Sequence, residues 1–149
     1  MIEITRIKEY TPALAEGLGK LMPTLSSKMD NTPIPKNVIE SITKSDYHQI
    51  FVAYDGEIIV GASVLSLIMG IDKNFASGPN AYLESFVTDA TVQGKGIGSA
   101  IWEEMLKWCR EKQVGKMEFT SNYKRESAHV FYAKKGCEIY DTAFFQYKF

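Results

Sequence analysis

The chain has 149 residues, of which 45% are hydrophobic and 23% are charged, and its formal net charge is −1. This length fits one ordinary domain, and this composition supports a packed core rather than disorder. Without a basic surplus, nucleic acid is not the expected partner, and no apolar run reaches the ~18 residues of a membrane span. The start of the chain lacks a signal-peptide pattern, and Cys109 and Cys137 lack metal or redox spacing. We therefore expect a cytoplasmic protein that binds no metal and keeps two free thiols.

The first third of the chain predicts one strand and two helices. Residues 2–7 alternate between apolar and polar side chains, which is typical of a strand. Thr11-Pro12 supplies an N-cap and a proline at the first helical position, and this helix is predicted to run to about Met22, where Pro23 helps to end it. A loop rich in Ser, Asp, Asn and Pro then leads into a second helix over about residues 35–43.

The middle of the chain predicts three strands. Residues 49–54 and 58–69 are apolar runs joined by Asp55-Gly56, which is a strong hairpin signal. Gly61 lies inside the second run and indicates a bulge. After a polar loop, residues 82–88 form the next predicted strand.

The last third predicts a helix over residues 97–112, a strand over 116–121 and a helix over 126–135 that is ended by Gly136. Residues 137–149 are predicted to form two closing strands. The expected order along the chain is therefore β-α-α-β-β-β-α-β-α-β-β.

The most informative segment is Gln93-Gly94-Lys95-Gly96-Ile97-Gly98-Ser99, which connects the strand at 82–88 to the helix at 97–112. A strand, a glycine turn and a helix start place backbone N–H groups at a positively polarised helix end, which suits a phosphate or pyrophosphate. Glycine keeps side chains away from the anion and accepts a positive φ. The segment is not a P-loop, because Asp89 stands where the first glycine belongs, and Ser99 breaks the Rossmann spacing. A tight connection without a ligand is the alternative.

Three segments resemble the GNAT superfamily of N-acetyltransferases. The spacing of residues 93–98 (Gln-x-x-Gly-x-Gly) resembles its acetyl-CoA signature, Arg/Gln-x-x-Gly-x-Gly/Ala. Residues 82–88 (Tyr-Leu-Glu-Ser-Phe-Val-Thr) resemble its fourth strand, and residues 125–137 are similar to its R-x-x-A-H-x-F-Y-x-x-x-G-F segment. Together the resemblance covers roughly residues 50–149 in the family's order.

The resemblance implies an α/β (α+β, GNAT-type) fold in a single domain, residues 1–149. Its mixed, mostly antiparallel sheet would have six to seven strands, with splayed central strands and about four flanking helices. It also implies that the pantetheine arm of the cofactor pairs with residues 86–88 like an extra strand. Gln93 stands where Arg is commoner, and Lys95 is expected to compensate in part; Cys137 stands where the family usually has Phe, a packing change.

The implied reaction is direct transfer of an acetyl group from acetyl-CoA to a primary amine, most simply that of a small molecule. Glu84 matches the family's candidate base, with Glu118 in reserve, and Tyr132 matches its candidate general acid. His129 and His48 are expected to have structural or no special roles. The residues expected to bind the cofactor are Phe86, Val87, Thr88, Gln93, Gly94, Lys95, Gly96, Ile97, Gly98, Ser99 and Arg125.

Three questions stay open from the sequence. The acceptor is unidentified, with a protein N-terminus or lysine as the alternative to a small molecule. A non-catalytic acyl-CoA-binding or regulatory module is the alternative to an enzyme. The aromatic side chains of residues 144–149 either fill closing strands or form the contact of a homodimer.

Overall fold

The computed structural model describes all 149 residues and contains five strands and four α-helices. The strands are β1 (Ile2–Ile7), β2 (His48–Asp55), β3 (Ile58–Ile68), β4 (Asn80–Thr88) and β5 (Met117–Glu118). The helices are α1 (Pro12–Leu25), α2 (Lys36–Thr43), α3 (Ile97–Glu111) and α4 (Glu126–Lys134), with short 3-10 turns at Lys73–Phe75 and Ala90–Val92. The chain divides into a first unit, Met1–Phe119, and a second unit, Thr120–Phe149.

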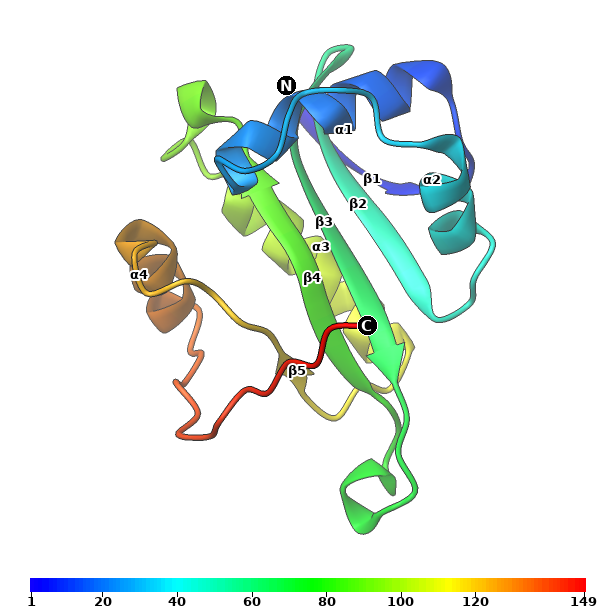
Figure 1. Cartoon of the computed structure of the whole chain (residues 1–149), viewed down its shortest axis with the longest axis vertical. Coiled ribbons are helices and arrows are strands. Elements are labelled where there is room, and N and C mark those ends of the chain that lie inside the picture. Colours follow the sequence, from blue (N-terminus) through cyan, green and yellow to red (C-terminus); the bar gives the residue numbers. More distant parts are fainter. The chain divides into compact units, whose positions relative to one another are not determined.

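The first unit is built on one mixed sheet with the strand order β1-β2-β3-β4-β5 (Figure 1). Strands β1 to β4 are antiparallel to their neighbours, and β5 is parallel to β4. The β2–β3 hairpin turns at Gly56, which has a φ of +61°, so the turn predicted at Asp55-Gly56 is confirmed. Val60 is an extra residue in the β2–β3 ladder, next to Gly61, where a bulge was predicted.

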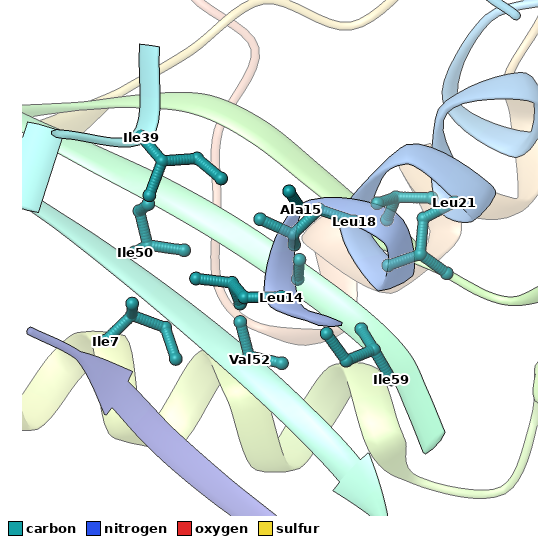
Figure 2. Close-up of a cluster of buried hydrophobic side chains, with 11 residues drawn as sticks. Ile7, Leu14, Ala15, Leu18, Leu21, Ile39, Ile50, Val52 and Ile59 are labelled. Carbon is teal, nitrogen blue, oxygen red and sulfur yellow. The ribbon is translucent and has the colours of Figure 1, made fainter. Parts of the chain in front are cut away.

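Helices α1 and α2 cover one face of this sheet and α3 covers the other (Figure 1). The core under α1 and α2 is an aliphatic cluster (Figure 2) of Ile7, Leu14, Ala15, Leu18, Leu21, Ile39, Ile50, Val52, Ile59, Ala62 and Val87. Burying a Leu or Ile side chain contributes about 1.5–3 kcal/mol, so this cluster supplies much of the unit's stability. On the other face, Trp108 of α3 packs edge-on against Phe51, with 6.0 Å between ring centroids.

Helix α1 begins as the sequence predicts but ends later. Thr11 is the N-cap, and its hydroxyl accepts a hydrogen bond from the Leu14 N–H at 3.1 Å. The predicted end at Met22 is wrong, because Pro23 lies inside the helix, which continues to Leu25. A proline in the last turn removes only one N–H donor, and the Ser26 N–H still donates to the Met22 carbonyl at 3.0 Å.

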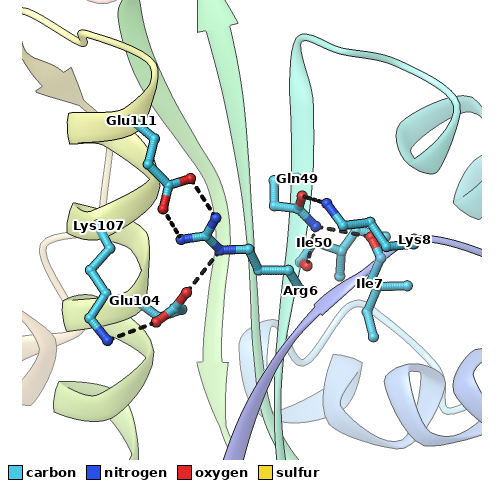
Figure 3. Close-up of polar contacts among 8 residues, drawn as sticks. All are labelled: Arg6, Ile7, Lys8, Gln49, Ile50, Glu104, Lys107 and Glu111. Atoms are coloured by element: carbon cyan, nitrogen blue, oxygen red, sulfur yellow. Dashed lines mark hydrogen bonds and ion pairs between the residues drawn. The ribbon is translucent and has the colours of Figure 1, made fainter.

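Charged and polar contacts hold β1 against helix α3 and against strand β2 (Figure 3). The Arg6 guanidinium donates to Glu104 at 2.8 Å and to both carboxylate oxygens of Glu111 at 2.6 and 2.9 Å, so it fixes β1 to α3. The buried Gln49 side-chain amide donates to the Ile7 and Ile50 carbonyls, each at 2.9 Å. These bonds satisfy polar groups where β1 ends.

The predicted six- to seven-stranded sheet is wrong, because residues 137–149 form no strand and the sheet has five strands. A strand needs the hydrogen-bonding edge of a neighbour. Within this segment, the Thr142 N–H donates to the nearby Tyr140 carbonyl, which is a local turn contact. The rings of Tyr147 and Phe149 pack edge-on against each other, with 5.1 Å between their centroids. The strand predicted over 116–121 is shorter than expected and comprises only β5.

The second unit contains α4, which begins and ends close to its predicted bounds. Gly136 has a φ of +85° after the helix. The Gly136 N–H donates to the Ala133 carbonyl and the Cys137 N–H to the Tyr132 carbonyl, which together form a Schellman motif. None of the helices in the structure combines the length and the apolar character needed to cross a membrane.

Candidate functional site

The glycine turn before α3 has the backbone geometry that requires glycine. Gly94 and Gly96 both have a φ of +82°, in the left-handed region that side chains disfavour. No heavy atom lies within 4 Å of the position that a Cβ would take at either residue, so the turn is open on that side. Gly96 is also the N-cap of α3, and a glycine offers no side-chain oxygen to the helix.

Three backbone donors are therefore left at the start of α3. The first hydrogen bond of the helix runs from the Ala100 N–H to the Gly96 carbonyl at 3.0 Å. The N–H groups of Ile97, Gly98 and Ser99 precede it and cannot bond within the helix. The first turn of α3 contains no acidic side chain. A positively polarised helix end with free donors and no competing carboxylate is a favourable position for an anion.

The flanks of the turn add one cation and one ordering contact. Lys95 is exposed between the two left-handed glycines. The side-chain amide of Gln93 donates a hydrogen bond to the Thr88 carbonyl at 3.4 Å, which ties Gln93 to the end of β4. Asp89 accepts hydrogen bonds from the Thr91 hydroxyl and N–H, which hold the pKa of its carboxyl below the usual value. We call the residues from Gln93 to Ser99 the glycine cradle.

The ladder between β4 and β5 is short, and the splay of the central strands that the resemblance implies stays a prediction. Its two pairs are Ala81 with Met117 and Tyr82 with Glu118. Strand β4 continues to Thr88, six residues past the last pair, while it remains paired to β3. Among the residues predicted to meet the cofactor arm, Val87 is buried and the Phe86 ring packs against Trp102 at 6.3 Å. The edge of β4 that leads to the glycine cradle thus lies beyond the β5 ladder.

Glu84, the candidate base, is the extra residue of a bulge in β4. Val64 of β3 pairs with Ser85 and Leu65 pairs with Leu83, so Glu84 has no partner in this ladder. Its side chain is exposed. Bulges redirect a side chain and are enriched near active sites. No glycine or proline marks this position, so the sequence held no signal for the bulge.

Glu118, the reserve base, is less suited to the role. It lies on β5 beside Tyr82 and forms an ion pair with Lys116, at 3.4 Å between Nζ and Oε1. Both side chains are about half exposed, so this ion pair is weak. Even so, Glu118 has a cation beside its carboxylate, whereas Glu84 takes part in none of the ion pairs of the structure.

Tyr132 and Arg125 belong to the second unit. Tyr132 lies on α4 and is buried, with 8% of its surface exposed. Burial raises the pKa of its hydroxyl, an effect that nearby Arg125 partly offsets and Cys137 reinforces. The hydroxyl is therefore protonated throughout the neutral range and has a proton to give. Arg125 is the N-cap of α4, and its backbone N–H donates to the Asn122 carbonyl at 3.0 Å.

The two histidines differ in setting. The Nε2 atom of His129 is buried without a hydrogen-bond partner, and its ring lies 6.3 Å from that of Tyr123. Its packing role stays a prediction. His48 begins β2, and its Nδ1 atom lies 2.9 Å from the Ser45 hydroxyl, a partner that the sequence did not reveal. No group of three or more His, Cys, Asp or Glu side chains is placed to hold a metal ion.

Comparison with known proteins gives one family. Residues 18–137 match the acetyltransferase (GNAT) family. A protein of Bacillus subtilis (strain 168), described as the uncharacterized N-acetyltransferase YhdJ, is 24% identical over 97 residues. The match covers 65% of this chain and 66% of that protein, which is just under two thirds of its length.

Solved structures share the fold. An aminoglycoside acetyltransferase, meta-AAC0020, from an uncultured soil metagenomic sample superposes with a TM-score of 0.84 at 20% identity, covering 99% of this chain and 96% of the other. The aminoglycoside N-acetyltransferase AAC(6')-Iy in complex with CoA gives a TM-score of 0.79 at 16% identity, covering 99% and 95%. A protein described as a transcriptional regulator from Bacillus halodurans C-125 gives 0.83 at 20% identity, covering 99% and 100%.

Proposed function

Because the chain belongs to the GNAT family of acetyltransferases, we propose that it transfers an acetyl group from acetyl-CoA directly to a primary amine of a small molecule. The observation that carries the proposal is the glycine cradle, where left-handed Gly94 and Gly96 precede three unbonded N–H groups of α3. The family match extends over residues 18–137, on both units, which supports their serving one domain.

The cofactor is proposed to lie along the end of β4. Its pyrophosphate accepts hydrogen bonds from the N–H groups of Ile97, Gly98 and Ser99, with Lys95 as the nearby cation. Its pantetheine arm runs beside Phe86, Val87 and Thr88, beyond the point where the β5 ladder stops. From Thr88 to Glu84 the strand covers about 13 Å. The thioester would thus approach the bulge that presents Glu84.

The proposed chemistry needs one base and one acid. An alkyl amine is mostly protonated at neutral pH and must lose a proton before its nitrogen can attack the thioester carbonyl. Exposed Glu84 takes that proton, directly or through water. When the C–N bond has formed, the C–S bond breaks and the CoA thiolate leaves. Tyr132, whose raised pKa keeps it protonated, gives the thiolate its proton. Arg125 is proposed to contact the cofactor.

A small-molecule acceptor is favoured by the names of two solved structures that share this fold, both of them aminoglycoside acetyltransferases. Their identity to this chain is 20% and 16%, so they guide the choice of amines for an assay and do not identify the substrate.

The proposal is tested by measuring thiol release from acetyl-CoA with a panel of amines that includes aminoglycosides, hexosamines, simple alkylamines and a lysine peptide. Glu84→Gln should lower kcat about a hundredfold or more and leave the KM for acetyl-CoA unchanged. Glu118→Gln is the matched control on the neighbouring strand and should change neither constant appreciably. CoA binding without thiol release from any amine would overturn the proposal in favour of a binding module.

A further inference from the structure

A line of three polar side chains crosses the sheet on the face that carries α1 and α2. His48 of β2 pairs with Ser66 of β3, and Ser66 pairs with Tyr82 of β4. His48 and Ser66 each lie two residues from a side chain, Ile50 and Val64, that packs in or against the aliphatic core on that face. Since side chains alternate along a strand, the three belong to the same face. We call His48, Ser66 and Tyr82 the polar row.

The polar row lies at the end of the sheet that the helices leave uncovered. Helix α1 crosses the sheet near the β2–β3 hairpin, whereas the row lies where β2 begins and β3 ends (Figure 1). His48 and Tyr82 are partly exposed, and Ser66 is 8% exposed between them. A half-buried strip of hydrogen-bonding groups is unusual beside an aliphatic core, because polar groups lose hydration when buried.

His48 is held in one orientation by its own loop. Its Nδ1 atom lies 2.9 Å from the Ser45 hydroxyl, whose oxygen also accepts a hydrogen bond from the Tyr47 N–H at 3.1 Å. The Ser45 contact fixes the ring and engages one of its two nitrogens. The other nitrogen, Nε2, is not part of that contact, and the side chain as a whole is partly exposed.

The row leads directly to the bulge. Tyr82 precedes Glu84 by two residues on β4. His48 and Tyr82 lie two strand spacings apart across the sheet, which is about 10 Å, and Glu84 lies about 7 Å from Tyr82 along β4. No Lys or Arg belongs to this row, and Glu84 is exposed beside it. The surface thus offers a carboxylate at one end and hydroxyl and imidazole groups at the other.

We propose, on the basis of the acetyl transfer proposed above, that the polar row seats the acceptor, with His48 and Ser66 as positioning residues. The reacting amine lies at Glu84. A hydroxyl that the substrate carries several bonds away from this nitrogen exchanges hydrogen bonds with His48 Nε2 and Ser66 Oγ. The row therefore selects hydroxylated amines over apolar amines of the same length or ring size.

The test compares pairs of amines that differ only in one hydroxyl group: 4-aminocyclohexanol with cyclohexylamine, and 6-aminohexan-1-ol with hexylamine. Wild-type protein should show the lower KM for the hydroxylated member of each pair. His48→Ala and Ser66→Ala should raise that KM about fivefold, the loss of one net hydrogen bond, and leave the KM of the apolar member unchanged. Tyr47→Phe, an exposed neighbour of His48, is the matched control and should change neither.

Calorimetric titration with CoA accompanies each variant, because an unchanged affinity shows that the first unit is folded. Equal rises in KM for both members of a pair, or no rise for either, would overturn the role of the polar row while leaving the acetyl transfer intact. Absence of thiol release from every amine with wild-type protein would instead overturn the acetyl transfer, and the acceptor seat with it.

Discussion

Replacement of Gly96 by alanine separates the structural need for glycine from its role in binding. Gly96 has a φ of +82° and open space where a Cβ would stand, and Gly56 in the β2–β3 hairpin has a φ of +61° and the same open surroundings. An alanine in the left-handed region costs roughly 1–2 kcal/mol. Gly96→Ala and Gly56→Ala should therefore lower Tm by similar amounts, about 2–4 °C for each kcal/mol in a domain of this length.

Only the Gly96 variant should weaken CoA binding. Relief of the strain moves residue 96 out of its left-handed conformation and turns the N–H groups of residues 97–99 away from the pyrophosphate. Losing one hydrogen bond to a charged group costs about 1.5–3 kcal/mol, so Kd should rise roughly ten- to a hundredfold. Calorimetric titration with CoA, alongside thermal unfolding, measures both effects. Equal affinities in Gly96→Ala and Gly56→Ala would refute the cradle.

Three further substitutions and one labelling experiment test other features of the structure. Gly98→Val should raise the KM for acetyl-CoA sharply without unfolding the protein, since valine is no worse than glycine inside a helix; normal acetyl-CoA kinetics would contradict this. Tyr132→Phe should lower kcat about a hundredfold and leave the CoA affinity unchanged; a full wild-type rate in this variant would exclude Tyr132 as the acid. Because the pKa of the Tyr132 hydroxyl is raised, wild-type activity should not fall below pH ~10 through loss of this proton. Arg6→Ala should lower Tm by about 2–4 °C near neutral pH. Arg6 lowers the pKa of Glu111 from its ordinary value of 4.5, so this stabilisation is present above that pH and is lost as the pH falls through the lowered pKa. The difference in Tm between wild type and Arg6→Ala should therefore shrink below pH ~4. A difference that grows in acid would contradict the ion pair. Burial raises the pKa of the Cys109 thiol to about 11, so iodoacetamide at pH 8 should leave it unlabelled in the folded protein, as mass spectrometry would show, and rapid labelling would mean that α3 opens.

Elements with a local chemical signal could be predicted from the sequence. The Thr11 cap, the Asp55-Gly56 hairpin and the Gly136 helix end each depend on a few neighbouring residues, and the structure confirms all three. The glycine cradle belongs to the same class, because Gly94 and Gly96 adopt the left-handed conformation that only glycine accepts readily. Gly98 differs, since it lies inside the first turn of α3.

Features that depend on distant pairing could not be predicted in this way. The aromatic alternation of residues 144–149 indicates a strand, but a strand forms only where a partner edge is available, and the structure gives this segment none. The bulge at Glu84 arises from the register between β3 and β4, which no local residue encodes. The polar row likewise exists only because β2, β3 and β4 pair in one particular register.

The most direct test of the central claim is calorimetric titration of folded wild-type protein with CoA and, separately, with pantetheine. We expect saturable one-to-one uptake of CoA well below millimolar concentration. We expect far weaker uptake of pantetheine, which lacks the pyrophosphate that we propose binds at the start of α3. No uptake of CoA at millimolar concentration, or equal affinity for the two compounds, would contradict it.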